Sequence, residues 1–260
     1  MDILDRAAPR LTESDVQDRL NLFVKRHAQA YGLGMQVLNL LGSRAENLLD
    51  SLPAPVRAGL GRTTEAALRG AFDAAQASRG MIGDPPDWLA TAIGTAMGAA
   101  GGAGGLATSL AELPVTVTVL MRGVQARALD HGFDPAEASV RFDCLHVLGS
   151  AGPLTQDDGA ELAFLAARMT LTGPALNRLI ASVAPRLATA LGQKLAAQAV
   201  PVLGAVAGAA TNYAYLTYYQ DMAHVHFGLR RLAIDADRDE AEIRRDFIAL
   251  LPPRRVLRGF

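Results

Sequence analysis

The chain has a single cysteine, Cys144, and only 5% of its 260 residues are aromatic. One cysteine cannot form an intrachain disulfide, so nothing indicates an oxidising compartment. Neither charge is in excess, because 25 basic side chains face 26 acidic ones, and half of the residues are hydrophobic. This balance excludes a disordered chain and gives no basic surface for nucleic acid, so we expect no nucleic acid partner. The first residues lack the order of a signal peptide, and we expect a cytoplasmic location.

Small residues are abundant instead. The 48 Ala and 25 Gly make up about 28% of the chain, which favours closely packed helices over sheets. Residues 115–119 alternate Val and Thr and alone suggest a strand, but their apolar positions continue along one helical face. No repeat or linker stands out. We therefore predict an all-α protein, a single compact multi-helix domain with glycine-rich, closely packed central helices.

Start and stop signals divide the chain into three parts. We expect a helical extension over residues 1–52, the main helical domain over 53–251, and a basic tail over 252–260. The first helix should end at the glycines 32–34. The expected helix starts are Ser14, Pro55, Asp87, Pro114, Asp134, and Asp235 or Asp237.

Charge is almost absent from two stretches of the sequence. Residues 88–121 carry only Glu112, and residues 195–220 carry no charged side chain. Glycines recur every four residues in both stretches, which places them on one face of a helix and allows another backbone to approach closely. We predict that the two glycine-marked helices pack together as a glycine zipper. The helix-packing glycines are Gly94, Gly98, Gly102, Gly204 and Gly208.

The first of these stretches invites a membrane interpretation. Residues 88–111 exceed the roughly 18 to 20 uncharged residues that a span needs. However, fourteen of these 24 residues are Gly or Ala, and small side chains contribute little to transfer into lipid. The glycines of residues 101–105 would also divide the stretch into two short pieces. A buried soluble helix pair is favoured, while a peripheral or re-entrant membrane element and a true span stay open as alternatives.

Three segments together resemble the EcsC family. They are the glycine-rich residues 101–105 with Glu112-Leu113-Pro114 after them, residues 128–134, and residues 200–212 with their Pro-x-x-Gly-x-x-x-Gly-x-x-x-Asn string. Ala223, Phe227 and Arg230-Arg231-Leu232 fit the segment that closes the family's domain, and the likeness covers about residues 60–250. Many relatives would have Asp at position 112. The resemblance implies a bacterial all-helical protein, named for a gene beside an ABC transporter, with no established enzymatic activity and no catalytic residue to carry over.

Two polar residues of the uncharged stretches are candidate buried polar or ligand-contact residues. Glu112 could contact a ligand or a lipid headgroup, but it more readily caps the helix opened by Pro114 and meets an arginine. Asn212 could contact a ligand, or it could form a buried hydrogen bond between helices. The tyrosines at 213, 215, 218 and 219 could line a groove or mark a membrane interface, although the wetter end of a buried helix is a commoner place for them.

The histidines do not form a metal pattern. His224 and His226 differ by about 200° around a helix, so they cannot share one ion, and Cys144 with His146 fails for the same reason. The glycine cluster lacks the strand and the spacing of a phosphate-binding loop. We therefore predict no metal, no cofactor and no catalytic residue. Arg254, Arg255 and Arg258 are candidate contacts to an anionic surface, with a frayed terminus as the alternative.

These observations lead to two hypotheses of function. The first is a non-enzymatic helical protein in the cytoplasm, peripheral at the inner membrane, whose partners are an anionic membrane surface, a lipid or a component of a membrane transporter. The alternative is a small enzyme or lipid-binding carrier with an apolar groove near Glu112.

Overall fold

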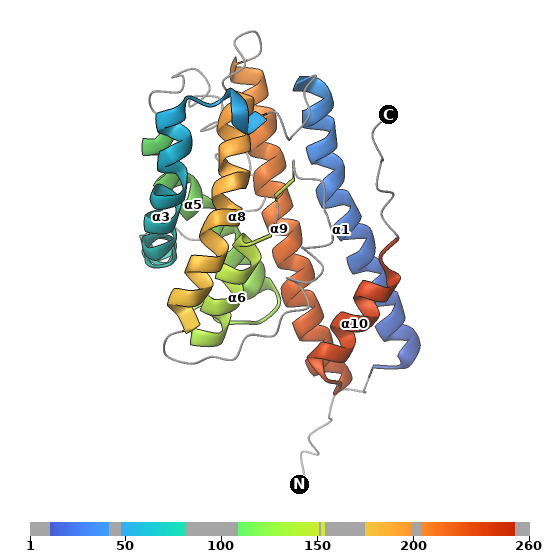
Figure 1. Cartoon of the computed structure of the whole chain (residues 1–260). Coiled ribbons are helices and arrows are strands. Elements are labelled where there is room, and N and C mark those ends of the chain that lie inside the picture. Colours follow the sequence, from blue (N-terminus) through green and yellow to red (C-terminus); the bar gives the residue numbers. More distant parts are fainter. Residues whose placement is uncertain are drawn as a thin grey trace.

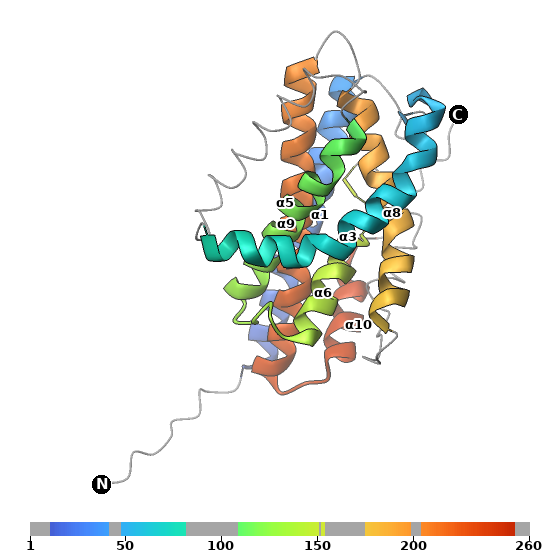
Figure 2. The ribbon, with the colours of Figure 1, turned by 90° about the vertical axis from the view of Figure 1, so that its left-hand side faces the viewer.

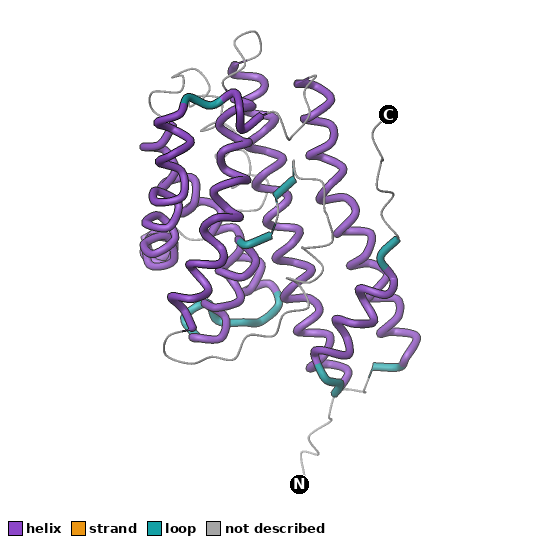
Figure 3. Tube along the Cα trace, in the orientation of Figure 1, coloured by secondary structure: helices purple, strands orange, loops and turns teal. Residues whose placement is uncertain are grey.

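The computed structural model describes residues 11–41, 48–81, 109–150, 152–153, 175–198 and 204–252, and every regular element in these ranges is a helix (Figure 3). The all-α prediction is therefore confirmed. The elements are α1 (Glu13–Leu41), a short 3-10 helix η1 (Leu49–Ser51), α3 (Ala54–Met81), α5 (Ser109–Asp130), α6 (Ala138–Leu148), α8 (Ala175–Gln198), α9 (Gly204–Ala236) and α10 (Glu240–Leu250).

Four long helices form the centre of the molecule. α3 and α9 each pack against both α5 and α8, so α5 and α8 lie across the bundle from each other (Figures 1 and 2). α6 fills one end of this group, where it contacts α5, α8 and α9. α1 runs along the outer side of α9, and α10 crosses the ends of both (Figure 1). The resulting core is continuous through the bundle, and a smaller apolar cluster joins α1, α9 and α10.

Several helix boundaries differ from those expected. α1 continues through the glycines to Leu41, because Ala30 and Val37 are buried and tertiary packing outweighs the weak helix propensity of glycine. Pro114 does not open α5 but lies inside it, since that helix begins at Ser109. The predicted helix start at Asp87 and the helix after it lie outside the described residues.

None of the aspartates expected to start α6 and α10 is the cap of its helix. The Asp134 carboxylate accepts a hydrogen bond from the Ala136 amide in a turn, so α6 begins only at Ala138. Asp239 caps α10 by accepting from the Ala241 amide, whereas Asp235 binds arginines and Asp237 has a left-handed φ of 53°. The sequence does contain a capping aspartate for α10, but three aspartates lie close together there, and only the structure identifies Asp239 as the cap.

The predicted glycine pairing is not tested. Gly94, Gly98 and Gly102 lie outside the described residues, and Gly204 and Gly208 lie in the first two turns of α9. Their packing stays a prediction.

Two other glycines do permit close helix contacts. A Cβ on Gly228 of α9 would lie 2.5 Å from the Phe23 ring of α1, and one on Gly192 of α8 would lie 2.6 Å from Leu49. Neither glycine belongs to a repeated spacing, so sequence reasoning missed both.

We expect Gly228→Ala to destabilise the fold by about 1 to 3 kcal/mol, because the Phe23 ring must move while His131 limits the space on the other side. Gly70→Ala is the matched control. Gly70 lies inside α3 with open space around it, so an added methyl should stabilise that helix by up to about 1 kcal/mol. Urea unfolding of both variants gives the comparison, and equal effects of the same sign would contradict the close contact.

Candidate functional site

A lysine lies in the centre of the four-helix bundle. Lys194 of α8 is 2% exposed, and its ammonium donates a 3.4 Å hydrogen bond to Thr116 Oγ1 of α5, across the bundle. Burial, the largest effect, lowers the pKa of Lys194 to about 8, while the nearby carboxylate of Glu112 acts in the opposite direction. Among the described residues this is the one hydrogen bond found for an ammonium that has three donors.

Thr64 of α3 lies at the same level of the bundle as Thr116. Gly59 of α3 lies against Leu110 of α5, and the two helices run in the same direction. Thr64 lies five residues after Gly59, and Thr116 lies six residues after Leu110, so the two threonines are at about the same height in the bundle. Thr64 is fully buried, and its hydroxyl has no hydrogen-bond partner within the described ranges.

Thr211 of α9 completes this level. The Tyr215 hydroxyl donates a 2.6 Å hydrogen bond to the Ala190 carbonyl oxygen, which fixes the register of the antiparallel helices α8 and α9. Lys194 lies one turn beyond Ala190, and Thr211 lies one turn before Tyr215, in the same direction along the bundle. Thr211 is also fully buried, and its hydroxyl finds no partner in the part of the chain that the structure describes. We call Thr64, Thr116, Lys194 and Thr211 the buried polar layer, with one residue from each of the four helices.

Both predicted polar candidates lie beside this layer on the same helices. Glu112 is partly exposed in the first turn of α5, one turn before Thr116, and its charge acts on Lys194. It lies within a helix that has already begun, rather than capping one that starts at Pro114. Asn212 is 9% exposed and directly follows Thr211. Glu112 therefore lies one turn from Thr116 on α5 and Asn212 next to Thr211 on α9, whereas the sequence analysis did not single out Lys194.

A second polar cluster joins α6 to α9. Asp143 accepts a hydrogen bond from Arg230 at 2.5 Å and lies 3.2 Å from the buried His226. Burial alone would raise the pKa of Asp143, but attraction and hydrogen bonding from His226 and Arg230 outweigh it and lower that pKa to about 2. The His146 ring packs 5.6 Å from that of His226. Because Arg230 and His226 of α9 both lie beside the Asp143 carboxylate of α6, this cluster connects the two helices.

His224 points to a different neighbour, as its offset from His226 predicts. Its Nδ1 lies 3.1 Å from Nε2 of His131, in the turn after α5, so one imidazole donates a hydrogen bond to the other. Burial lowers the pKa of His224 to about 4, and the charge of Arg26 adds to this. Burial also lowers the pKa of His131, which the Asp130 carboxylate opposes.

We expect the histidine pair to make the fold acid-sensitive. Since the folded state keeps His224 neutral to about pH 4, the unfolded chain binds more protons between pH 6.5 and 4, and stability falls as the pH is lowered through that range. His224→Phe should fit beside the Phe23 ring and should lose less stability over the same range. Thermal melts at pH 7.5, 6, 5 and 4 measure the difference, and parallel curves for the two proteins would contradict this role.

Metal and thiol chemistry find little support in these clusters. Within the described ranges no three His, Cys, Asp or Glu side chains are placed to hold a metal ion. Cys144 is fully buried, and burial raises the pKa of its thiol far above the ordinary value. A buried thiol of this kind is inert.

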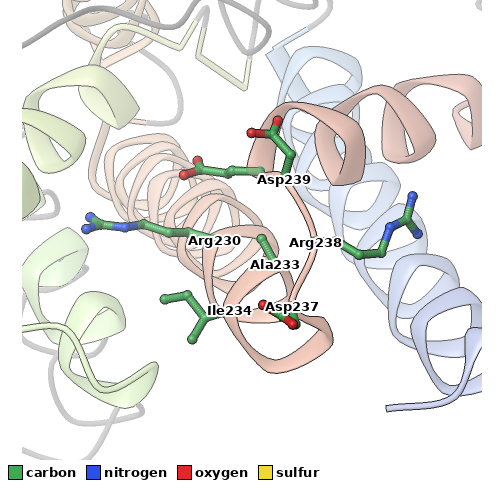
Figure 4. Close-up of a pocket in the computed structure, with 7 residues that line it drawn as sticks. Arg230, Ala233, Ile234, Asp237, Arg238 and Asp239 are labelled. Carbon is green, nitrogen blue, oxygen red and sulfur yellow. The ribbon is translucent and has the colours of Figure 1, made fainter. Parts of the chain in front are cut away.

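A surface hollow of about 520 Å³ lies at the turn between α9 and α10, lined by Arg230, Ala233, Ile234, Asp237, Arg238, Asp239 and Glu240. Figure 4 shows its two arginines pointing in opposite directions, Arg230 toward α6 and Arg238 toward α1. Arg230 binds Asp143, and Arg238 binds Asp246 at 2.7 Å. Because both cations already have carboxylate partners and the hollow is open, we do not assign a ligand to it.

The chain matches a known protein family. The model of the EcsC protein family matches residues 88–232, which is more than half of the chain. The chain belongs to the EcsC family. Neither the comparison with curated proteins nor that with solved structures returned a match.

The EcsC match contains most of the polar groups described above. Thr116, Lys194, Thr211 and the Asp143 cluster lie inside it, whereas Thr64 comes from the preceding helix. α1 and α10 lie outside the match, although both pack on α9. The division into an extension, a main domain and a basic tail stays a prediction, and Arg254, Arg255 and Arg258 lie outside the described residues.

The described helices bear on the alternative of a membrane span. In the described part of this EcsC chain, no helix combines the length and the apolar character that crossing a bilayer requires. Residues 88–108, which raised the question, lie outside that part.

Proposed function

We propose that this EcsC protein is a non-enzymatic helical protein of the cytoplasm that acts at the surface of the membrane and serves a membrane transporter there. The observation that carries the proposal is the distribution of charge over the bundle. Three adjacent helix segments carry no charged side chain: residues 28–41 of α1, 113–121 of α5 and 204–220 of α9. We call this region the uncharged end; Glu112, in the first turn of α5, directly borders it.

The uncharged end is continuous across the three helices. Tyr31 of α1 contacts Tyr218 of α9 through their hydroxyls, 3.2 Å apart, and Gly123 of α5 lies against Gln220 of α9. Val115 and Tyr213 are 49% and 44% exposed there, on neighbouring helices. Apolar side chains of this kind carry no charge of their own that would be desolvated in the headgroup region.

The opposite end of the same helices is different. Arg19 binds Asp235 at 3.0 Å, and Arg238 binds Asp246. A surface with this density of ion pairs favours water. The molecule is therefore polarised along its length, which supports one orientation at a membrane surface.

Vesicle sedimentation tests the membrane role. Val115→Glu and Tyr213→Glu should each reduce the fraction bound to vesicles of phosphatidylglycerol and phosphatidylcholine by about tenfold, because a carboxylate would have to enter the interface. Leu129→Glu and Ile234→Glu are matched controls, since these side chains are 41% and 57% exposed at the other ends of the same two helices. They should bind as the wild type does.

Salt separates this mechanism from the basic tail. Binding through the uncharged end should persist in 0.5 M NaCl, at which charge attraction is screened. Release by salt, with no effect of the two glutamates, would contradict the proposal and would implicate Arg254, Arg255 and Arg258 instead. A wild type that binds no vesicle would also overturn it.

The transporter role is tested separately in cells. An ABC transporter subunit should co-purify with the wild type, and less of it with Tyr213→Glu than with Ile234→Glu. Unchanged transport after deletion of the gene would count against this part of the proposal.

A second candidate function is a lipid-binding carrier. The polar layer beside Glu112 favours it, because a buried ammonium and buried hydroxyls lie where an apolar groove would need a polar anchor.

A further inference from the structure

We propose that the buried polar layer binds a singly charged phosphate group. Lys194 and Thr116 meet across the bundle, and Thr64 and Thr211 are buried on the other two helices, between which bundle proteins commonly build ligand sites. The Lys194 ammonium has one hydrogen bond within the described residues, and the hydroxyls of Thr64 and Thr211 have none. Buried polar groups in this condition are costly unless a ligand or water satisfies them.

The chemistry of the layer selects an anion. A lysine ammonium only donates hydrogen bonds and repels metal ions, while threonine hydroxyls can donate to an acceptor oxygen. A phosphate presents several oxygens in a tetrahedral arrangement, which suits donors that arrive from four surrounding helices better than a single-atom acceptor does. Glu112 adds a nearby negative charge, so a phosphate with one charge fits better than one with two.

The position of the layer suggests how such a group reaches it. Lys194 is buried, but Thr116, which accepts its hydrogen bond, is partly exposed, as is Glu112 one turn before it. Thr116 lies in the α5 segment of the uncharged end, and Glu112 directly precedes that segment. A phosphodiester headgroup at the membrane surface and free dihydrogen phosphate carry this same chemistry, and the headgroup source rests on the membrane role proposed above.

The side-chain NMR signals of the two lysines test the site directly. The chain contains only Lys25, which is exposed, and Lys194, so each titration has an internal reference. The probes are inorganic phosphate at pH 6 and dihexanoylphosphatidylglycerol below its micelle concentration, which requires no vesicle. We expect a saturable shift of the Lys194 signal with at least one probe and no shift at Lys25.

Three variants show whether the layer is responsible. Isothermal titration calorimetry measures binding to the variants, because Lys194→Met has no Lys194 signal. Lys194→Met should weaken binding at least about thirtyfold and Thr211→Val about tenfold, in keeping with the loss of one charged and one neutral hydrogen bond. Thr189→Val is the control, because its hydroxyl lies on the exposed face of α8 and bonds to the Pro185 carbonyl oxygen. It should bind within twofold of the wild type. Circular dichroism confirms that each variant is folded.

The outcomes separate the two sources and the two proposals. A shift with phosphate alone assigns free phosphate, and a shift with the lipid assigns the headgroup. No shift at Lys194 with either probe, or equal shifts at both lysines that signify an adventitious ion only, would overturn the phosphate site. Vesicle binding that persists in Lys194→Met leaves the membrane role standing, whereas a Lys194 shift without vesicle binding supports the site and refutes the membrane role.

Discussion

Lys194→Met should stabilise the protein by about 3 kcal/mol at pH 7. The pKa of Lys194 falls from 10.5 to about 8 in the folded chain, and each pKa unit corresponds to roughly 1.4 kcal/mol. Methionine keeps the length of the side chain and carries no charge to desolvate. The remaining partner, Glu112, is partly exposed and can be solvated by water, so removal of the ammonium does not strand a buried carboxylate.

The pH dependence has a definite sign. Because the folded pKa of Lys194 is depressed, the unfolded chain binds more protons between pH 8 and 10.5, and stability rises with pH in that window. The difference in unfolding free energy between Lys194→Met and the wild type should therefore shrink from pH 7.5 to pH 10. Urea unfolding at these pH values measures it, and a constant difference would contradict the burial of a charged amine.

Asp143→Asn should have an effect of similar size and opposite sign. It should destabilise the fold by about 3 kcal/mol at pH 7, because it leaves the Arg230 guanidinium without its carboxylate and removes the acceptor that lies beside the buried His226. The wild type keeps this contribution above pH 4 and loses it as the pH falls toward about 2, the folded pKa of Asp143. The variant should lack that acid transition.

Asp246→Asn is the matched control for this experiment. Asp246 also binds an arginine, Arg238 at 2.7 Å, but its side chain is 46% exposed on α10. Exposed ion pairs contribute less than about 1 kcal/mol. If both substitutions cost the same free energy in urea unfolding, the buried cluster between α6 and α9 has no special role.

The helical class could be predicted from the sequence, for reasons visible at particular residues. Residues 115–119 were correctly assigned to a helix, because their apolar periodicity extends beyond the β-branched run. His224 and His226 face different neighbours, as a two-residue offset on a helix requires. These conclusions depend on local geometry, which a sequence contains.

Features that depend on contacts between helices distant in the sequence could not be predicted. Gly192 and Gly228 are recognisable only once Leu49 and Phe23 are in place against them. Lys194 had a signal that went unused, since it is the last charge before the uncharged residues 195–220 and one of only two lysines. That its ammonium crosses the bundle to Thr116 depends on the register of α5 and α8.

The pKa of Lys194 shows directly whether its ammonium is buried in the bundle. With both lysine side chains labelled, an NMR titration from pH 6 to 12 should show the Lys194 signal titrating near pH 8, the lowered pKa of this ammonium. This signal should vanish in Lys194→Met. A Lys194 signal that titrates near the ordinary value of 10.5 would show that the ammonium is in water, and the buried polar layer would then have no charged centre.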